Sequence, residues 1–170
     1  IFFLPALEPS LVAVENGVVI GQRRAAGHLI LPLRALDLLL NVLKYKPFLI
    51  KPNNHELGEM FGVTLATDEE IEKYARKLKE MGAVNVLISM AGDGAMLIDE
   101  NGEIHRCGVC KGKVKNSVGA GDSMVAGFTA GILQGDYEYA LKLGTAAGGA
   151  TAFSDGLAQK EKIAELFETL

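Results

Sequence analysis

Residues 116–128 read NSVGAGDSMVAGF, a glycine-rich turn followed by a run of small apolar residues. The run predicts a helix that starts at this turn, and Asp122 lies between the glycines and the apolar run. At a helix N-terminus several backbone N–H groups lack partners, and the aligned peptide dipoles add positive potential. Glycines let that backbone approach an anion closely. The backbone of Gly119, Ala120 and Gly121 is therefore suited to hold an anion such as a phosphate.

Asp122 in this turn has two interpretations. A carboxylate repels a bound phosphate, but it is useful if it accepts the proton of a hydroxyl group that attacks the phosphate. The turn would then stabilise charge on the transferred group while Asp122 acts as the base. Alternatively, Asp122 caps the helix and the glycines only close a turn, which is the usual explanation of an isolated G-x-G-D pattern. Only the rest of the sequence distinguishes the two.

Apolar stretches alternate with helical ones along the chain. The clearest helix spans 67–82, where Thr67 caps an acidic first turn and Gly82 ends the helix. Strands are expected at 1–4, 28–31, 47–53, 84–90, 94–99 and 103–107. Further helices are expected at 12–27, 35–43, 54–62, 120–134, 136–153 and 158–169. This order predicts one α/β domain over 1–170 with a mostly parallel sheet, to which the hairpin at 94–107 adds an antiparallel piece.

Composition excludes several classes of protein. The 170 residues are 49% hydrophobic and 22% charged, so the chain can bury a core and is not disordered. A net charge of −4 argues against a nucleic-acid binder, whose affinity rests on neutralising phosphates. The apolar start contains Pro5, Glu8 and Pro9 and predicts neither a signal peptide nor a membrane span. With only two cysteines, we expect a reducing, cytoplasmic setting.

Four segments, in their order along the chain, resemble the ribokinase-like (PfkB-type) family of sugar kinases. They are KPNNHE at 51–56, SMAGDGA at 89–95, GAGDSMVAGFTAG at 119–131 and GGATAFSDG at 148–156. The resemblance extends from about Pro47 to the end. It implies a three-layer α/β/α sandwich of which only the C-terminal, nucleotide-binding portion is present, without the N-terminal half and the lid.

The resemblance also assigns roles to residues. It implies that Asp122 is the catalytic base and that the backbone of Gly119, Ala120 and Gly121 forms the anion hole. Segment 148–156 would border the adenine pocket. The implied nucleotide loop comprises Ser89, Met90, Ala91, Gly92, Asp93 and Gly94, with Gly121 also at the nucleotide.

A second set of implied residues precedes these along the chain. Asn53 and Glu56 would organise Mg²⁺ mainly through water, although both could simply begin a helix after Pro52. Lys51 either contacts phosphate or is an ordinary lysine at a strand end.

The implied activity is ATP-dependent phosphorylation of a sugar phosphate. Within the family, the matching segments most resemble 1-phosphofructokinases, which implies D-fructose 1-phosphate as substrate and fructose 1,6-bisphosphate as product. Tagatose-6-phosphate kinases are next. A truncated, non-catalytic nucleotide-binding fragment is the remaining alternative. The implied partners are ATP, Mg²⁺ and a sugar phosphate, without nucleic acid or membrane, and full-length members would pair as homodimers.

Two segments depart from the family pattern. Residues 4–9 (LPALEP) and 32–37 (PLRALD) replace small glycine-containing turns. Codons for Pro-Leu-Arg-Ala read one base out of phase can encode Thr-Ser-Gly, so either a shift of frame within residues 1–40 or genuine divergence accounts for the difference.

Cys107 and Cys110 form a lone C-x-x-C pattern. A structural zinc site usually needs two further ligands, and His105 has the wrong spacing on its strand. A redox motif would precede a helix, which the following KGKVK does not predict. We therefore expect both cysteines to be structural.

Overall fold

The computed structural model describes residues 11–15, 18–22 and 35–170. The chain divides into two compact units, Ile1–Val86 and Leu87–Leu170, and each is described by itself. Among the sequence expectations, the strands at 1–4 and 28–31, segment 4–9 and residues 32–34 lie outside the described residues. None of the described helices is long and apolar enough to cross a membrane.

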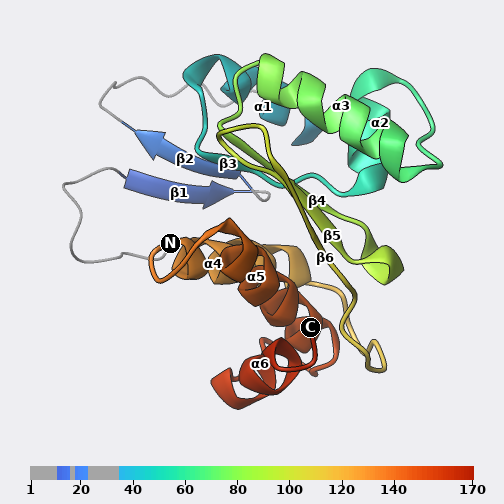
Figure 1. Ribbon diagram of the computed structural model, residues 1–170, viewed down its shortest axis with the longest axis vertical. Helices are drawn as coiled ribbons and strands as arrows, with labels where there is room; N and C mark the ends of the chain where they lie inside the picture. The colour runs from blue at the N-terminus through green and yellow to red at the C-terminus, as the bar shows by residue number, and fades with distance from the viewer. Residues whose placement is uncertain (1–10, 16–17, 23–34) are drawn as a thin grey trace. The chain divides into compact units, whose positions relative to one another are not determined.

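The first unit begins with a pair of antiparallel strands, β1 (Leu11–Glu15) and β2 (Val18–Gln22) (Figure 1). The helix expected at 12–27 is therefore wrong. Both segments are rich in β-branched residues, which favour strands, and Asn16-Gly17 between them is a strong hairpin signal. β2 pairs antiparallel with β3 (Leu49–Ile50), which in turn pairs parallel with β4 (Asn85–Ser89).

Three α-helices of the first unit match the sequence expectations closely. They are α1 (Ala35–Val42), α2 (Asn54–Phe61) and α3 (Asp68–Glu80), with a short 3₁₀ turn, η1 (Leu43–Tyr45), after α1. Thr67 caps α3 as expected, and Gly62 ends α2 in the left-handed conformation that favours glycine. The inner face of α3 is buried at Ile71, Ala75 and Leu78.

In the second unit, β4 continues and has β5 (Ala95–Ile98) as its neighbour, with the short turn η2 (Ala91–Asp93) between them. β5 pairs antiparallel with β6 (Ile104–Cys107), which confirms the expected hairpin. Every side chain of β5 is buried. Of the pairings described in the two units, only that of β3 with β4 is parallel, so the sheet is mixed rather than mostly parallel.

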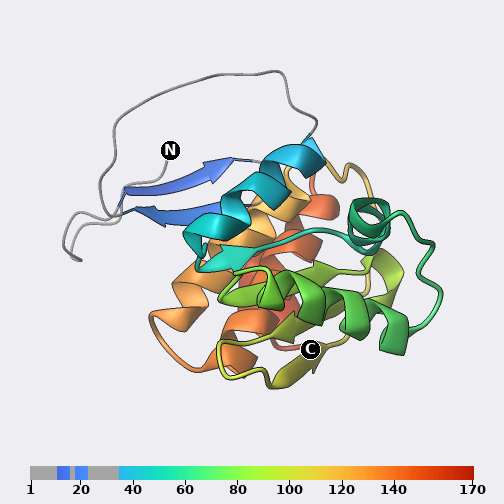
Figure 2. The same ribbon diagram turned by 90° about the horizontal axis from the view of Figure 1, so that it is seen from above.

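Helices α4 (Ala120–Ile132), α5 (Tyr137–Ala152) and α6 (Lys160–Phe167) complete the second unit. Figures 1 and 2 show α4 and α5, in orange and red, lying side by side. Glycines make this approach close, because a Cβ added at Gly127 would lie 2.8 Å from Cβ of Ala147. The packing fixes where the N-terminus of α4 lies relative to the C-terminal end of α5.

Candidate active site

The N-terminus of α4 differs from those of α2, α3 and α5 because no side chain caps it. Asn53, Thr67 and Asp136 cap those three helices with side-chain oxygens. Gly119 occupies the corresponding position of α4 with φ of 81°, in the left-handed region that favours glycine. Within the part of the chain that the structure describes, the N–H groups of Gly121 and Asp122 have no hydrogen-bond acceptor. Both donors are therefore available to an anion.

Asp122 lies in the first turn of α4 with an exposed side chain. Its carboxylate has no hydrogen-bond or ion-pair partner among the described residues, so it does not act as a side-chain cap. An exposed carboxylate beside two unpaired N–H groups can accept a proton from a hydroxyl group held at the turn. Its role as catalytic base remains a prediction.

The predicted nucleotide loop closes tightly between β4 and β5. Met90 N–H donates to Gly94 O at 2.9 Å, and Asp93 N–H donates to Met90 O at 2.9 Å. Gly94 has φ of 85°, and a Cβ there would collide with the carbonyl oxygen of Cys107. The expected turn is confirmed. Ala91, Gly92 and Asp93 are exposed at its tip, where backbone N–H groups could meet phosphates, and nucleotide binding remains a prediction.

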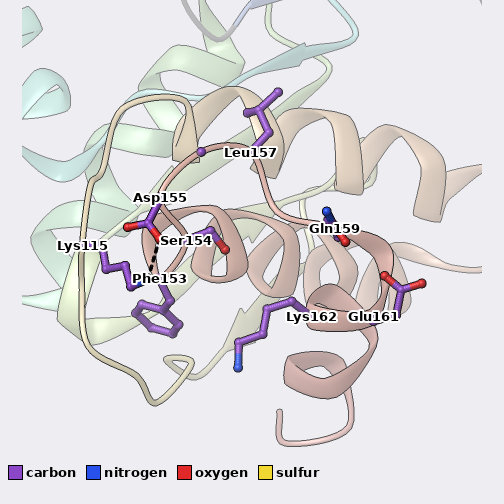
Figure 3. Close-up of a pocket in the computed structure, with 9 residues that line it drawn as sticks. Lys115, Phe153, Ser154, Asp155, Leu157, Gln159, Glu161 and Lys162 are labelled. Atoms are coloured by element: carbon purple, nitrogen blue, oxygen red, sulfur yellow. Dashed lines mark hydrogen bonds and ion pairs between the residues drawn. The ribbon is translucent and has the colours of Figure 1, made fainter.

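A pocket of about 630 Å³ lies in the second unit, at the C-terminal end of α5 (Figure 3). Its lining comes from Lys115, from the loop Phe153–Leu157 and from the start of α6. Lys115 Nζ forms an ion pair with Asp155 Oδ2 at 2.9 Å. The N–H groups of Lys115 and Asn116 both donate to Ala152 O, which ties the segment before α4 to the end of α5.

This pocket includes part of the segment that the sequence associated with adenine. Phe153, Ser154, Asp155 and Gly156 belong to both. Lys115 and the lining residues beyond 156 were not expected from the sequence; the latter are Leu157, Gln159, Glu161 and Lys162. The basic segment KGKVK at 111–115 was a usable signal, because lysines beside a predicted phosphate site raise the local potential.

The residues proposed to organise Mg²⁺ lie in the first unit and form a capping box on α2. Asn53 Oδ1 accepts the N–H of Glu56 at 2.8 Å, and Glu56 Oε2 accepts the N–H of Asn53 at 2.8 Å. Both residues therefore begin the helix after Pro52, as the alternative interpretation expected. Oε1 of Glu56 keeps no hydrogen-bond partner within the described residues, which fits an ion held through water. Lys51, at the end of β3, is half-buried.

Asp99, Glu103 and His105 place possible metal-ligand atoms within 4.8 Å of one another on the β5–β6 hairpin. The buried Asp99 carboxylate already accepts the N–H groups of Asn101 and Glu103 and contacts His105 Nε2 at 3.1 Å. Burial acts to raise the pKa of Asp99, but the hydrogen bonds from His105 and the two N–H groups outweigh it and lower the pKa. The cluster is fully explained as the organiser of a hairpin turn.

The two cysteines are free thiols. Cys110 is buried against α5 and α6, in a cluster with Ala146, Ala150 and Leu166. Burial raises the pKa of both thiols, so neither has the thiolate character of a reactive cysteine. This agrees with the structural role expected for them.

Comparison with proteins of known sequence gives a family match and curated relatives. Residues 18–163 match the model described as pfkB family carbohydrate kinase. Over 131 residues, 76% of the chain, the sequence is 52% identical to 1-phosphofructokinase from Bacillus subtilis and covers 43% of it. It is 41% identical over 127 residues, 74% of the chain, to D-tagatose-1-phosphate kinase from Bacillus licheniformis and covers 41% of it. The chain thus spans less than half the length of these relatives.

Solved structures show the fold. A provisionally named phosphofructokinase from Staphylococcus aureus matches 78% of this chain and 43% of its own with a TM-score of 0.73 and 42% identity. Ribokinase from Arabidopsis thaliana, in complex with ribose and ATP, matches 71% of this chain and 40% of its own with a TM-score of 0.64 and 21% identity. The ribokinase-like α/β fold expected from the sequence is confirmed. The chain belongs to the pfkB family of carbohydrate kinases.

Proposed function

We propose that the protein containing this chain is an ATP-dependent sugar-phosphate kinase that phosphorylates D-fructose 1-phosphate at its 6-hydroxyl. One observation carries the proposal. In a carbohydrate kinase family member, the N-terminus of α4 combines unpaired N–H groups at Gly121 and Asp122 with the free carboxylate of Asp122. Anion donors and a proton acceptor within one turn suit phosphoryl transfer to an alcohol.

The chemistry follows from these groups. Asp122 removes the proton from the sugar hydroxyl as its oxygen attacks the γ-phosphorus of ATP. The bond from the γ-phosphorus to the bridging oxygen breaks, ADP leaves, and the proton remains on the carboxylate until it passes to water. The N–H groups of the turn stabilise the charge that spreads over the transferred phosphoryl oxygens, and such stabilisation supplies most of the catalysis in this reaction class.

The remaining predicted residues would serve ATP and its metal ion. The turn from Ser89 to Gly94 offers backbone donors to the phosphates, and the pocket beside Phe153 suits the adenine ring of ATP. Asn53 and Glu56 would hold Mg²⁺ through water, using the carboxylate oxygen that the capping box leaves unpaired. When bound, Mg²⁺ would neutralise negative charge on the phosphates.

Two alternatives remain. A tagatose phosphate is supported by the relative named D-tagatose-1-phosphate kinase, so the phosphate at carbon 1 is favoured over the tagatose 6-phosphate expected from the sequence. The second alternative is a nucleotide-binding fragment without catalysis.

A coupled assay of ADP release tests the proposal. The 170-residue chain and the full-length protein encoded by its gene are each given ATP with fructose 1-phosphate, tagatose 1-phosphate, tagatose 6-phosphate, fructose 6-phosphate or ribose. We expect the full-length protein to show the highest kcat/KM with fructose 1-phosphate. A higher value with tagatose 1-phosphate would transfer the assignment to that sugar. ATP binding without turnover of any sugar phosphate in the 170-residue chain alone would support the fragment. Absence of turnover of every sugar phosphate in the full-length protein would refute the proposed activity.

A further inference from the structure

Thr151 on α5 joins the N-terminus of α4 to the loop after α5. Its Oγ1–H donates to Ser123 Oγ at 2.8 Å, and the same oxygen accepts the N–H of Ala158 at 3.3 Å. Thr151 is 2% exposed, so water does not compete for these bonds. Its hydroxyl thus contacts the residue that directly follows Asp122.

The methyl group of Thr151 lies near Gly119 at the start of the turn. A Cβ added at Gly119 would lie 3.9 Å from Cγ2 of Thr151. Gly148 lies three positions earlier on α5, so it shares a helix face with Thr151, and a Cβ there would lie 3.1 Å from the carbonyl oxygen of Ala120. This face of α5 therefore packs directly against the residues that flank Asp122.

We infer that Thr151 is a positioning residue for phosphoryl transfer, holding the turn Gly119–Asp122 through its hydrogen bond to Ser123. The inference rests on the proposed function. Reaction rates depend on the placement of catalytic groups to within less than an ångström. The first turn of α4 has no side-chain cap of its own, so a buried bond from a neighbouring helix is well placed to fix it.

A purely structural role predicts a different result. If the Thr151 hydroxyl contributes only to stability, its loss lowers the melting temperature and leaves kcat unchanged. If it positions Asp122, kcat falls while the KM for the sugar phosphate changes little. Thr145 supplies a matched control, because it is a buried threonine on the same helix whose Oγ1–H donates to Leu141 O within that helix at 2.8 Å.

The test compares Thr151→Val, Thr151→Ser and Thr145→Val in the full-length protein, at saturating ATP. Valine keeps the shape of threonine and removes the hydroxyl, while serine keeps the hydroxyl. Loss of one buried hydrogen bond predicts a kcat about tenfold lower for Thr151→Val, with the KM for the sugar phosphate within about threefold of wild type. We expect Thr151→Ser to restore kcat to within about twofold, and Thr145→Val to lower the melting temperature without lowering kcat.

Two further measurements separate this inference from the proposed function. In a double-mutant cycle, Thr151→Val should have no additional effect on kcat when Ser123 is already alanine. Amide hydrogen exchange needs no activity, and the N–H groups of Ala120 and Ser123, which donate to Ser117 O and Gly119 O, should exchange about tenfold faster in Thr151→Val than in wild type. Faster exchange in Thr151→Val, together with a wild type that has no kinase activity, would support the role of Thr151 in holding the turn and refute the proposed function.

Each of three outcomes overturns the inference. The first is a kcat of Thr151→Val within twofold of an active wild type. The second is a kcat of Thr145→Val as low as that of Thr151→Val. The third is equal exchange of the Ala120 and Ser123 N–H groups in Thr151→Val and wild type.

Discussion

The contact between α4 and α5 makes Gly127→Ala a sharp test of the packing that supports the proposed site. An added Cβ would lie 2.8 Å from both Ala147 Cβ and Leu143 O, and 3.0 Å from Gly144 Cα. Carbon atoms pack favourably at about 3.5–4.0 Å, so the helices must separate locally by roughly 0.7 Å. Such overpacking costs about 1–3 kcal/mol, and the better helix propensity of alanine offsets up to ~1 kcal/mol.

We therefore expect Gly127→Ala to destabilise the protein by about 1–2 kcal/mol, which lowers the melting temperature by roughly 2–8 °C. The assay is urea and thermal unfolding followed by circular dichroism. Gly92→Ala is the control, because a Cβ there meets nothing within 4 Å, and its effect should stay within about 0.5 kcal/mol.

A second substitution identifies which contact causes the loss of stability in Gly127→Ala. Ala147→Gly removes one of the two closest atoms. The loss of stability in the double variant should therefore be about 1 kcal/mol smaller than the sum of the losses in the two single variants. A Gly127→Ala protein as stable as wild type, or strict additivity with Ala147→Gly, would refute the close approach of the two helices.

Three other predictions concern stability and titration. Asp99→Asn should lower the free energy of unfolding by about 1–3 kcal/mol at neutral pH. Because the folded pKa of Asp99 is lowered, this stabilisation is present above the unfolded pKa of about 3.9 and is lost as pH falls through the folded pKa. The free energies of unfolding of wild type and variant should therefore approach each other below about pH 4, and a constant difference between them from pH 7 to 3 would contradict this. Since burial raises the pKa of Cys107 and Cys110, both should react slowly with a thiol reagent at pH 7 in the folded protein. Their contribution to stability should be lost as pH rises above about 8.5 through their folded pKa values. Labelling at the rate of a free cysteine would disprove the burial. Asn53→Ala should cost about 1 kcal/mol in urea unfolding while Asn53→Asp keeps the cap, and equal losses in both variants would argue against the capping box.

Local signals explain the parts of the fold that the sequence predicts well. Thr67 before an acidic turn and Gly62 after an apolar run mark helix ends through short-range hydrogen bonds, and both lie where expected. The hairpin at 94–107 follows from two apolar runs around Asn101-Gly102. The helix expected at 12–27 is wrong because Asn16-Gly17 and the β-branched residues on both sides of it favour a hairpin.

The candidate site shows where prediction from the sequence ends. The glycine turn before Asp122 was found because its backbone conformation needs particular residues at fixed spacing. The bond from Thr151 to Ser123 spans 28 positions and the pair Lys115–Asp155 spans 40, and no local periodicity indicates either. Contacts of that kind depend on how helices and loops pack, which a single sequence does not display.

The most direct test of the proposed catalysis is the kcat of Asp122→Asn in the full-length protein, measured by ADP release with fructose 1-phosphate. Asparagine keeps the size of the side chain and removes the base, and Asp136→Asn is the control because asparagine caps α5 as well as aspartate does. We predict that Asp122→Asn lowers kcat by about 10²–10⁴-fold and leaves the affinity for ATP and the melting temperature nearly unchanged, while Asp136→Asn behaves like wild type. A kcat for Asp122→Asn within twofold of wild type would show that this carboxylate is not the base.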